Sequence, residues 1–125
     1  MSRILIIEDN EDARRFMALA LKGEGHDVAV AEDGDAGLLI QRHAPAEVLI
    51  TDIFMPNKDG IETIIDFRKK FPTVKIIAMS GGRATGTVNY LETAREIGAD
   101  HCLAKPFGVH ELLSAVQLVA TKERQ

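Results

Sequence analysis

The segment Ile4-Leu5-Ile6-Ile7-Glu8-Asp9 decides the fold. Its first four residues form a continuous aliphatic run rich in β-branched side chains, which is typical of a parallel strand buried on both faces. Two carboxylates follow at once, so this strand would carry negative charge to its carboxyl end. Four further short apolar runs predict strands, at residues 28–30, 48–50, 74–79 and 102–104. The run at 28–30 is short and flanked by charged residues, which favours a place at the sheet edge.

Segments with helical periodicity lie between these runs. In each, apolar residues recur at intervals of three and four, which predicts one buried face of a helix. Glycine or proline follows the first four segments, as expected where a helix ends. The predicted buried stripes are Ala13, Phe16, Met17, Ala20 and Leu21; Ala36, Leu39, Ile40 and His43; Ile61, Ile64, Ile65 and Arg68; Val88, Leu91 and Ala94 or Arg95; and Val109, Leu112, Leu113, Val116 and Leu118 or Val119.

Five strand-then-helix units predict a parallel sheet covered by helices on both faces. Right-handed crossovers leave few topologies, and a doubly wound five-stranded sheet of order 2-1-3-4-5, the flavodoxin-like α/β arrangement, is the common one at this size. In such folds ligands bind beyond the carboxyl ends of the strands, between strands 1 and 3. Candidate functional residues should therefore directly follow the strands.

The composition narrows the class of protein. Of 125 residues, 46% are hydrophobic and 27% charged, which is ordinary for a soluble globular domain. The net charge of −4 gives no reason to expect direct nucleic-acid binding. Cys102 is the only cysteine, which excludes an internal disulfide and fits a reducing compartment. No apolar run reaches the length of a membrane span, so we expect a cytoplasmic protein without a membrane partner.

Polar residues follow four of the predicted strands. Glu8 and Asp9 follow the first, Asp52 the third, Ser80 the fourth and Lys105 the fifth. Carboxylates this close would raise one another's pKa, and a divalent cation relieves that repulsion. Hard oxygen ligands favour Mg²⁺. A site with Mg²⁺, a lysine and a hydroxyl suits phosphoryl transfer, with the Asp52 carboxylate as nucleophile.

Each of these residues also has a plainer interpretation. Asp9 or Asn10 could cap the first helix. Ser80 could be a turn residue, and Lys105 a solvated surface lysine. Taken singly, each plain interpretation is the more common one, but the joint placement at four strand ends favours a shared site.

Four segments carry a resemblance to a known family. They are Ile4 to Asp9; residues 52–60 (DIFMPNKDG); Met79-Ser80-Gly81; and Lys105-Pro106-Phe107. In this order they resemble the signature segments of response-regulator receiver domains, the phosphate-accepting domains of two-component phosphorelays. The resemblance covers essentially the whole chain, so residues 1–125 are expected to form a single receiver domain without an output domain.

The resemblance implies a role for each site residue. Asp52 corresponds to the phosphoacceptor, and Asp9 to a direct Mg²⁺ ligand with Glu8 acting through water. The backbone carbonyl of Phe54 would be a further metal ligand. Ser80 and Lys105 correspond to the hydroxyl and the ammonium that bind the phosphoryl oxygens. The resemblance also implies a cis Lys105–Pro106 peptide and a turn shaped by Pro56 and Gly60, with Asp59 capping the third helix.

The implied function is signalling without substrate turnover. A sensor histidine kinase or a histidine phosphotransfer protein would donate the phosphoryl group, and an unidentified downstream protein would read the change in shape. One alternative function is that of a haloacid-dehalogenase-like phosphatase or hydrolase. Such sites generally have a second aspartate two positions after the nucleophile, and in this chain Phe54 occupies that position. A second rival is a phosphorylation-independent interaction module, which has no chemical need for the complete residue set.

Two features depart from the family pattern. Cys102 occupies the switch position, three residues before Lys105, where the family usually has an aromatic side chain. Strand alternation directs the neighbouring His101 to the opposite face, so it is not a substitute. The interval from Ser80 to Lys105 is a few residues longer than usual, and the excess is assigned to the glycine-rich residues 81–86.

Overall fold

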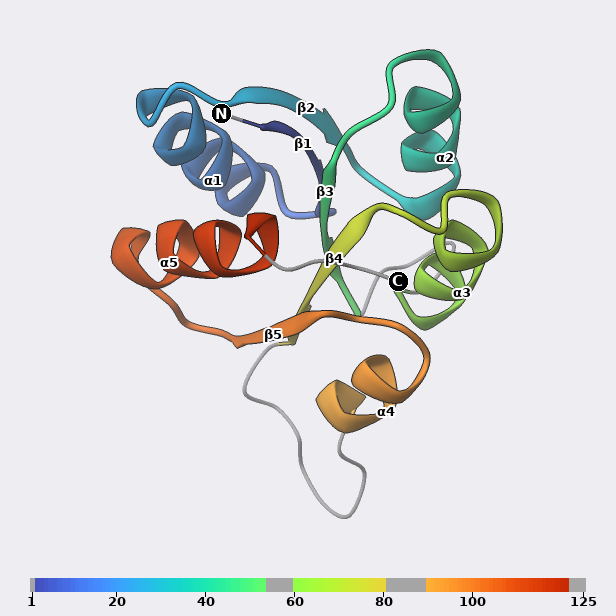
Figure 1. Ribbon diagram of the computed structural model, residues 1–125. Coiled ribbons are helices and arrows are strands. Elements are labelled where there is room, and N and C mark those ends of the chain that lie inside the picture. The colour runs from blue at the N-terminus through green and yellow to red at the C-terminus, as the bar shows by residue number, and fades with distance from the viewer. Residues whose placement is uncertain (1, 54–59, 81–89, 122–125) are drawn as a thin grey trace.

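The computed structural model describes residues 2–53, 60–80 and 90–121 (Figure 1). Within these residues strands and helices alternate as the sequence predicts. The strands are β1 (Arg3–Ile7), β2 (Asp27–Ala31), β3 (Val48–Asp52), β4 (Lys75–Ser80) and β5 (His101–Ala104). The helices are α1 (Glu11–Gly23), α2 (Gly34–His43), α3 (Gly60–Lys70), α4 (Tyr90–Glu96) and α5 (Val109–Ala120). None of these helices is long and apolar enough to cross a membrane.

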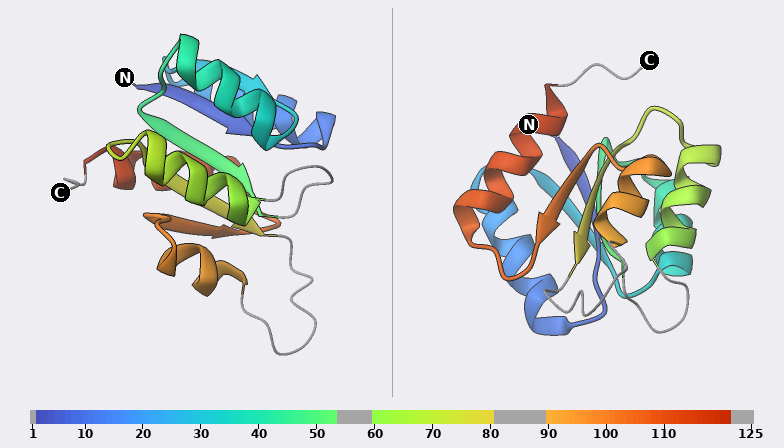
Figure 2. Two further views of the ribbon diagram at one scale, coloured as in Figure 1. Left: turned by 90° about the vertical axis from the view of Figure 1, so that its right-hand side faces the viewer. Right: turned by 90° about the horizontal axis from the view of Figure 1, so that it is seen from below.

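The strands form one parallel sheet of order β2-β1-β3-β4-β5, so the predicted doubly wound topology is confirmed. β2 lies at the edge, as the charged flanks of its short apolar run indicated. Helices α1 and α5 cover one face of the sheet, and α2, α3 and α4 cover the other (Figures 1 and 2). All strands run the same way, so their carboxyl ends gather at one end of the sheet.

The sheet separates two apolar cores. Ile4 and Ile6 point toward α1 and α5, and Leu5 and Ile7 toward the opposite face; all four are fully buried. This alternation follows from the two-residue period of a strand, and burial on both faces explains why the sequence of β1 is apolar without interruption.

The buried face of α2 differs from the predicted stripe. Leu39 is 55% exposed, and the buried residues are instead Gly34, Gly37, Leu38 and Gln41. Gly37 lies directly on β1, because a Cβ atom there would stand 2.3 Å from Cδ1 of Ile7. Gln41 is buried because its side-chain amide both donates to the carbonyl of Ala46 and accepts from its N–H. Ala36 and Ile40 of the predicted stripe do pack against the core. The prediction was wrong at Leu39, because the buried face passes through glycine and glutamine, which carry no hydrophobic signal.

The predicted face of α3 is also wrong in part. Ile64 is buried, but Ile65 is 38% exposed, and the buried face continues through Thr63 and Phe67. Arg68, placed in the apolar stripe, is half-buried and its guanidinium forms an ion pair with Asp100 at 3.3 Å. It also donates to three carbonyls, those of Pro72, Val74 and Gly98. Arg68 thus joins α3 to the turn before β5.

The other stripes agree more closely. In α1, Met17 and Leu21 are buried, whereas Phe16 is 39% exposed. In α5, Val119 rather than Leu118 faces the core. In α4, Ala94 rather than Arg95 is buried, and Val88 lies outside the described residues.

Candidate functional site

The carboxyl ends of β1, β3, β4 and β5 bring the predicted site residues together. Glu8 follows β1, Asp52 and Ser80 end β3 and β4, and Lys105 follows β5. The strand register places Ser80 beside Ala104, and the Lys105 N–H donates to the carbonyl of Ser80 at 2.8 Å. The site is therefore built on strand ends whose positions the sheet hydrogen bonds fix.

Lys105 binds both buried carboxylates of the site. Its Nζ lies 2.5 Å from Oδ2 of Asp52 and 2.6 Å from Oε1 of Glu8. Glu8 is 1% and Asp52 6% exposed, whereas the Lys105 side chain is 26% exposed. Lys105 is thus half-buried and bridges two carboxyl groups, rather than being a solvated surface lysine.

Burial and charge act in opposite directions on these groups. Burial raises the pKa of Glu8; the hydrogen bonds from Lys105 and from the Asn10 N–H oppose that rise, and the Asp52 charge adds to it. For Lys105, burial lowers the pKa, but the hydrogen bonds and charges of Asp52 and Glu8 outweigh it and leave the pKa raised. Lys105 therefore carries its charge at neutral pH.

Three carboxylates form an acidic cluster at the same place. One oxygen each from Glu8, Asp9 and Asp52 lies within 4.8 Å of the other two. Asp9 is exposed, so one side of the cluster faces solvent. A small set of carboxylate oxygens open to water matches Mg²⁺, which keeps several water ligands. The residues present thus fit the predicted cation.

The remaining predicted residues have mixed outcomes. Ser80 is 5% exposed, at the end of β4 beside β3. Phe54, Pro56 and Asp59 lie outside the described residues, as does the loop at 81–86. The Lys105–Pro106 peptide is cis, as the resemblance implied. Asn10 rather than Asp9 caps α1, accepting from the Ala13 N–H at 2.8 Å.

Cys102 is half-buried and packs against the core on the α2, α3 and α4 side of the sheet. Burial raises the pKa of its thiol, and the charge and hydrogen bond of Arg95 on α4 partly oppose that rise. His101 lies beside Leu103 and α5 on the opposite side, as strand alternation predicted. Position 102, the predicted switch position, thus holds a small thiol that contacts α4.

Gly60 places the start of α3 directly on the end of β3. Its N–H donates to the carbonyl of Ile53 at 2.7 Å. A Cβ atom at this position would lie 2.1 Å from the carbonyl oxygen of Asp52 and 2.4 Å from Cα of Ile53. Both atoms belong to the backbone and have no room to shift, so only glycine fits.

We predict that Gly60→Ala destabilises the fold by about 3 kcal/mol or more, because the methyl group must displace the backbone that carries Asp52. Urea unfolding measures this. Gly23→Ala is the matched control: nothing lies within 4 Å of its added Cβ, and it should be neutral or stabilising by up to about 1 kcal/mol. Equal stability of the two variants would contradict the packing argument.

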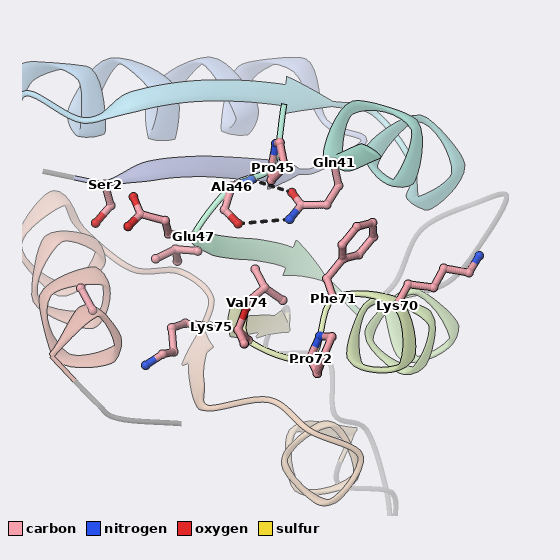
Figure 3. A pocket seen from close by; sticks show the side chains of 13 residues that line it. Ser2, Gln41, Pro45, Ala46, Glu47, Lys70, Phe71, Pro72, Val74 and Lys75 are labelled. Carbon is pink, nitrogen blue, oxygen red and sulfur yellow. Dashed lines mark hydrogen bonds between the residues drawn. The ribbon is translucent and has the colours of Figure 1, made fainter. Parts of the chain in front are cut away.

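One hollow in the described residues lies away from this site. It has a volume of about 680 Å³ and is lined by Ser2 just before β1, by the first residues of β3 and β4 and by the loops that precede these two strands (Figure 3). Its wall includes the Gln41–Ala46 hydrogen-bond pair. No predicted site residue lines it, because parallel strands put their carboxyl ends at the other end of the sheet.

Sequence reasoning missed two features next to the site. Arg14, on the first turns of α1, donates from Nη1 to the carbonyl of Glu8 at 2.8 Å. A basic residue near a helix amino terminus opposes the helix dipole, which is the signal that could have drawn attention to it. The second is a groove of about 400 Å³, lined by Ala13, Phe16, Met17, Lys105, Pro106 and Phe107. Phe16 in the predicted core stripe instead forms part of this groove.

Comparison with known proteins agrees with the fold. The model of the response regulator receiver domain family matches residues 4–117. The chain therefore belongs to the response regulator receiver domain family, whose members are signalling domains of two-component systems rather than turnover enzymes.

Individual relatives support this assignment. The chain is 36% identical over 118 residues to the KDP operon transcriptional regulatory protein KdpE of Escherichia coli, covering 94% of this chain and 51% of KdpE. It is 33% identical over 123 residues to the response regulator ArlR of Staphylococcus epidermidis, covering 98% of this chain and 54% of ArlR. The chain thus spans about half the length of these curated relatives.

A solved structure matches over nearly its full length. A putative response regulator from Chloroflexus aurantiacus is similar with a TM-score of 0.87 and 26% identity, covering 97% of this chain and 98% of that one.

Proposed function

We propose that this receiver domain accepts a phosphoryl group on Asp52 from the phosphohistidine of a sensor histidine kinase or a histidine phosphotransfer protein. Mg²⁺ would be held by Asp9, Asp52 and the Phe54 carbonyl, with Glu8 acting through water. The observation that carries the proposal is the contact of the Lys105 ammonium with a buried Asp52 carboxylate, beside two further acidic side chains.

An Asp52 carboxylate oxygen attacks phosphorus, the phosphorus–nitrogen bond of the donor breaks, and its electron pair stays on the imidazole, which takes up a proton. Bound Mg²⁺ would neutralise charge on the phosphoryl oxygens. Lys105 would turn from the carboxylate to a phosphoryl oxygen, and the Ser80 hydroxyl would donate to another.

Signalling would follow from the new charge. A phosphoryl group adds roughly −1.5 to −2 charges and strong acceptor oxygens. Ser80 and Lys105 closing on it would pull the ends of β4 and β5 toward β3 and shift a two-state equilibrium of α4 and β5. Because Cys102 rather than an aromatic side chain contacts α4, the conformational change would reach α4 through backbone movement more than through rotation of a ring. A downstream protein would read this surface.

A direct test uses the protein with Mg²⁺ and acetyl phosphate as a small donor. We expect a covalent phosphate that hydroxylamine and base remove, and that does not form when a chelator removes Mg²⁺. Absence of labelling both with the small donor and with a panel of histidine kinases would overturn the proposal and restore the phosphorylation-independent interaction module.

The apolar groove beside Lys105 fits the protein donor in this reaction. Phe16 of α1 and Phe107 after β5 both line it, together with Lys105, whose Nζ donates to Asp52. Because Lys105 belongs to both the groove and the site, a partner that brings a phosphohistidine to Asp52 would lie beside the groove, and an apolar side chain next to that histidine would fill it.

We predict that Phe16→Ala slows phosphotransfer from a histidine kinase about tenfold, because loss of a buried aromatic contact costs about 1.4 kcal/mol or more. The rate with acetyl phosphate should be unchanged, since a small donor does not use the groove. The matched control is Leu19→Ala, on the same helix, 65% exposed and outside the groove. Equal slowing with both donors would mean that Phe16 acts on the site itself.

A further inference from the structure

We infer that Arg14 is a positioning residue for the metal site: it fixes the peptide between Glu8 and Asp9, so that both carboxylates face the bound Mg²⁺. The inference rests on the proposed function, because the Mg²⁺ site is part of it. The main observation in its favour is a hydrogen bond: the half-buried Arg14 donates from Nη1 to the Glu8 carbonyl at 2.8 Å.

Arg14 contacts the segment that joins β1 to α1, which is only three residues long, from Glu8 to Asn10. Its first end is fixed because the Glu8 N–H donates to the carbonyl of Ala31 at 3.0 Å. Its last end is fixed because Asn10 caps α1 and donates from its N–H to Oε2 of Glu8 at 3.1 Å. The peptide between Glu8 and Asp9 lies in the middle, and the Arg14 hydrogen bond fixes its carbonyl.

Of the two carboxylates, that of Asp9 depends more on this peptide for its orientation. Glu8 is 1% exposed and held by Lys105, so packing orients its carboxylate. Asp9 is exposed, so the direction of its side chain follows from the backbone rather than from packing. Rotation of the peptide before Asp9 would turn this carboxylate away from Glu8 and Asp52, and the ligand set would lose its most solvent-accessible member.

Charge and positioning predict opposite effects for the loss of Arg14. A cation near three carboxylates repels Mg²⁺, so removal of its charge alone would tighten Mg²⁺ binding. Loss of the hydrogen bond that aims the ligands would weaken it. The neighbouring Arg15 supplies the charge without the contact: its side chain is 71% exposed, 3.9 Å from Glu11 in a surface ion pair.

The experiment is calorimetric titration of the phosphate-free protein with MgCl₂. We expect Arg14→Met, which keeps the aliphatic stem, to weaken Mg²⁺ binding about tenfold. Arg14→Lys keeps the charge and one possible donor, and should recover part of the affinity without reaching that of the wild type. Arg15→Met should bind Mg²⁺ as tightly as the wild type, or slightly more tightly.

Mg²⁺ binding by the wild type tests the proposed function, and binding by the variants tests the role of Arg14. If the wild type takes up no Mg²⁺, the proposed function fails. If the wild type binds Mg²⁺ and Arg14→Met binds it equally or more tightly, the positioning role fails and the proposed function stands. If circular dichroism shows that Arg14→Met does not fold, Arg14→Lys serves as the test. Weaker Mg²⁺ binding by Arg14→Lys would then support the positioning role, and wild-type affinity would contradict it.

Discussion

Asp52→Asn is expected to abolish phosphorylation by both acetyl phosphate and a histidine kinase. The amide that replaces the carboxylate is not a nucleophile, so no mixed anhydride can form. Its shape is nearly the same, and the amide oxygen can still accept a hydrogen bond from Lys105, so circular dichroism and thermal melting should show an intact fold. Phosphate incorporation per chain, measured by intact mass, checks the result.

The matched control is Asp27→Asn, which makes the same chemical change at the opposite end of the sheet. Asp27 is 68% exposed and forms a surface ion pair with Arg3 at 2.9 Å, which contributes little stability. This variant should be phosphorylated like the wild type. Undiminished labelling of Asp52→Asn, with the same hydroxylamine sensitivity, would show that another carboxylate carries the phosphate.

Lys105→Met is expected to slow phosphorylation by acetyl phosphate on the order of 10- to 10²-fold. Removal of one preorganised donor to a developing negative charge costs 10²- to 10³-fold in enzymes, and bound Mg²⁺ would offset part of that loss here. The exposed Lys69→Met, in the last turn of α3, is the control and should keep the wild-type rate. Equal rates for the two variants would remove Lys105 from the chemistry.

The same substitution also changes stability, with a defined dependence on pH. Loss of the ammonium leaves two buried carboxylates without their cation, at a cost of about 2–3 kcal/mol. The pKa of Glu8, already raised by burial, would rise further. A raised carboxyl pKa makes stability fall as pH rises between the unfolded and folded values. The destabilisation of Lys105→Met, measured by urea unfolding without Mg²⁺, should therefore be larger near pH 7 than near pH 5.

Much of this architecture is predictable from the chain because it rests on local patterns. The uninterrupted apolar run of β1 indicates burial on both faces, and parallel strands must share a carboxyl end. From these two facts the meeting of Glu8, Asp52 and Lys105 at one place follows before any distance is known. The chemical roles of these residues stay predictions until phosphorylation is measured.

The features that sequence reasoning missed depend on tertiary contacts. The buried face of α2 passes through Gly37, which is buried because β1 approaches it closely, not because it is apolar. Phe16 has the spacing of a core residue, but the chain segment after β5 leaves a groove there instead. Arg14 donates to a backbone carbonyl. Its unfavourable place near a helix amino terminus marks it in the sequence, but the sequence does not show which acceptor it binds.

The most direct measurement of the central claim is to locate the phosphate. The protein is phosphorylated with acetyl phosphate and Mg²⁺, then treated with borohydride, which reduces an aspartyl phosphate to homoserine, and the peptides are sequenced by mass spectrometry. We expect homoserine at position 52 and unchanged aspartate at position 9. Reduction at Asp9 or another carboxylate, with Asp52 intact, would contradict the assignment of Asp52 as the phosphoacceptor.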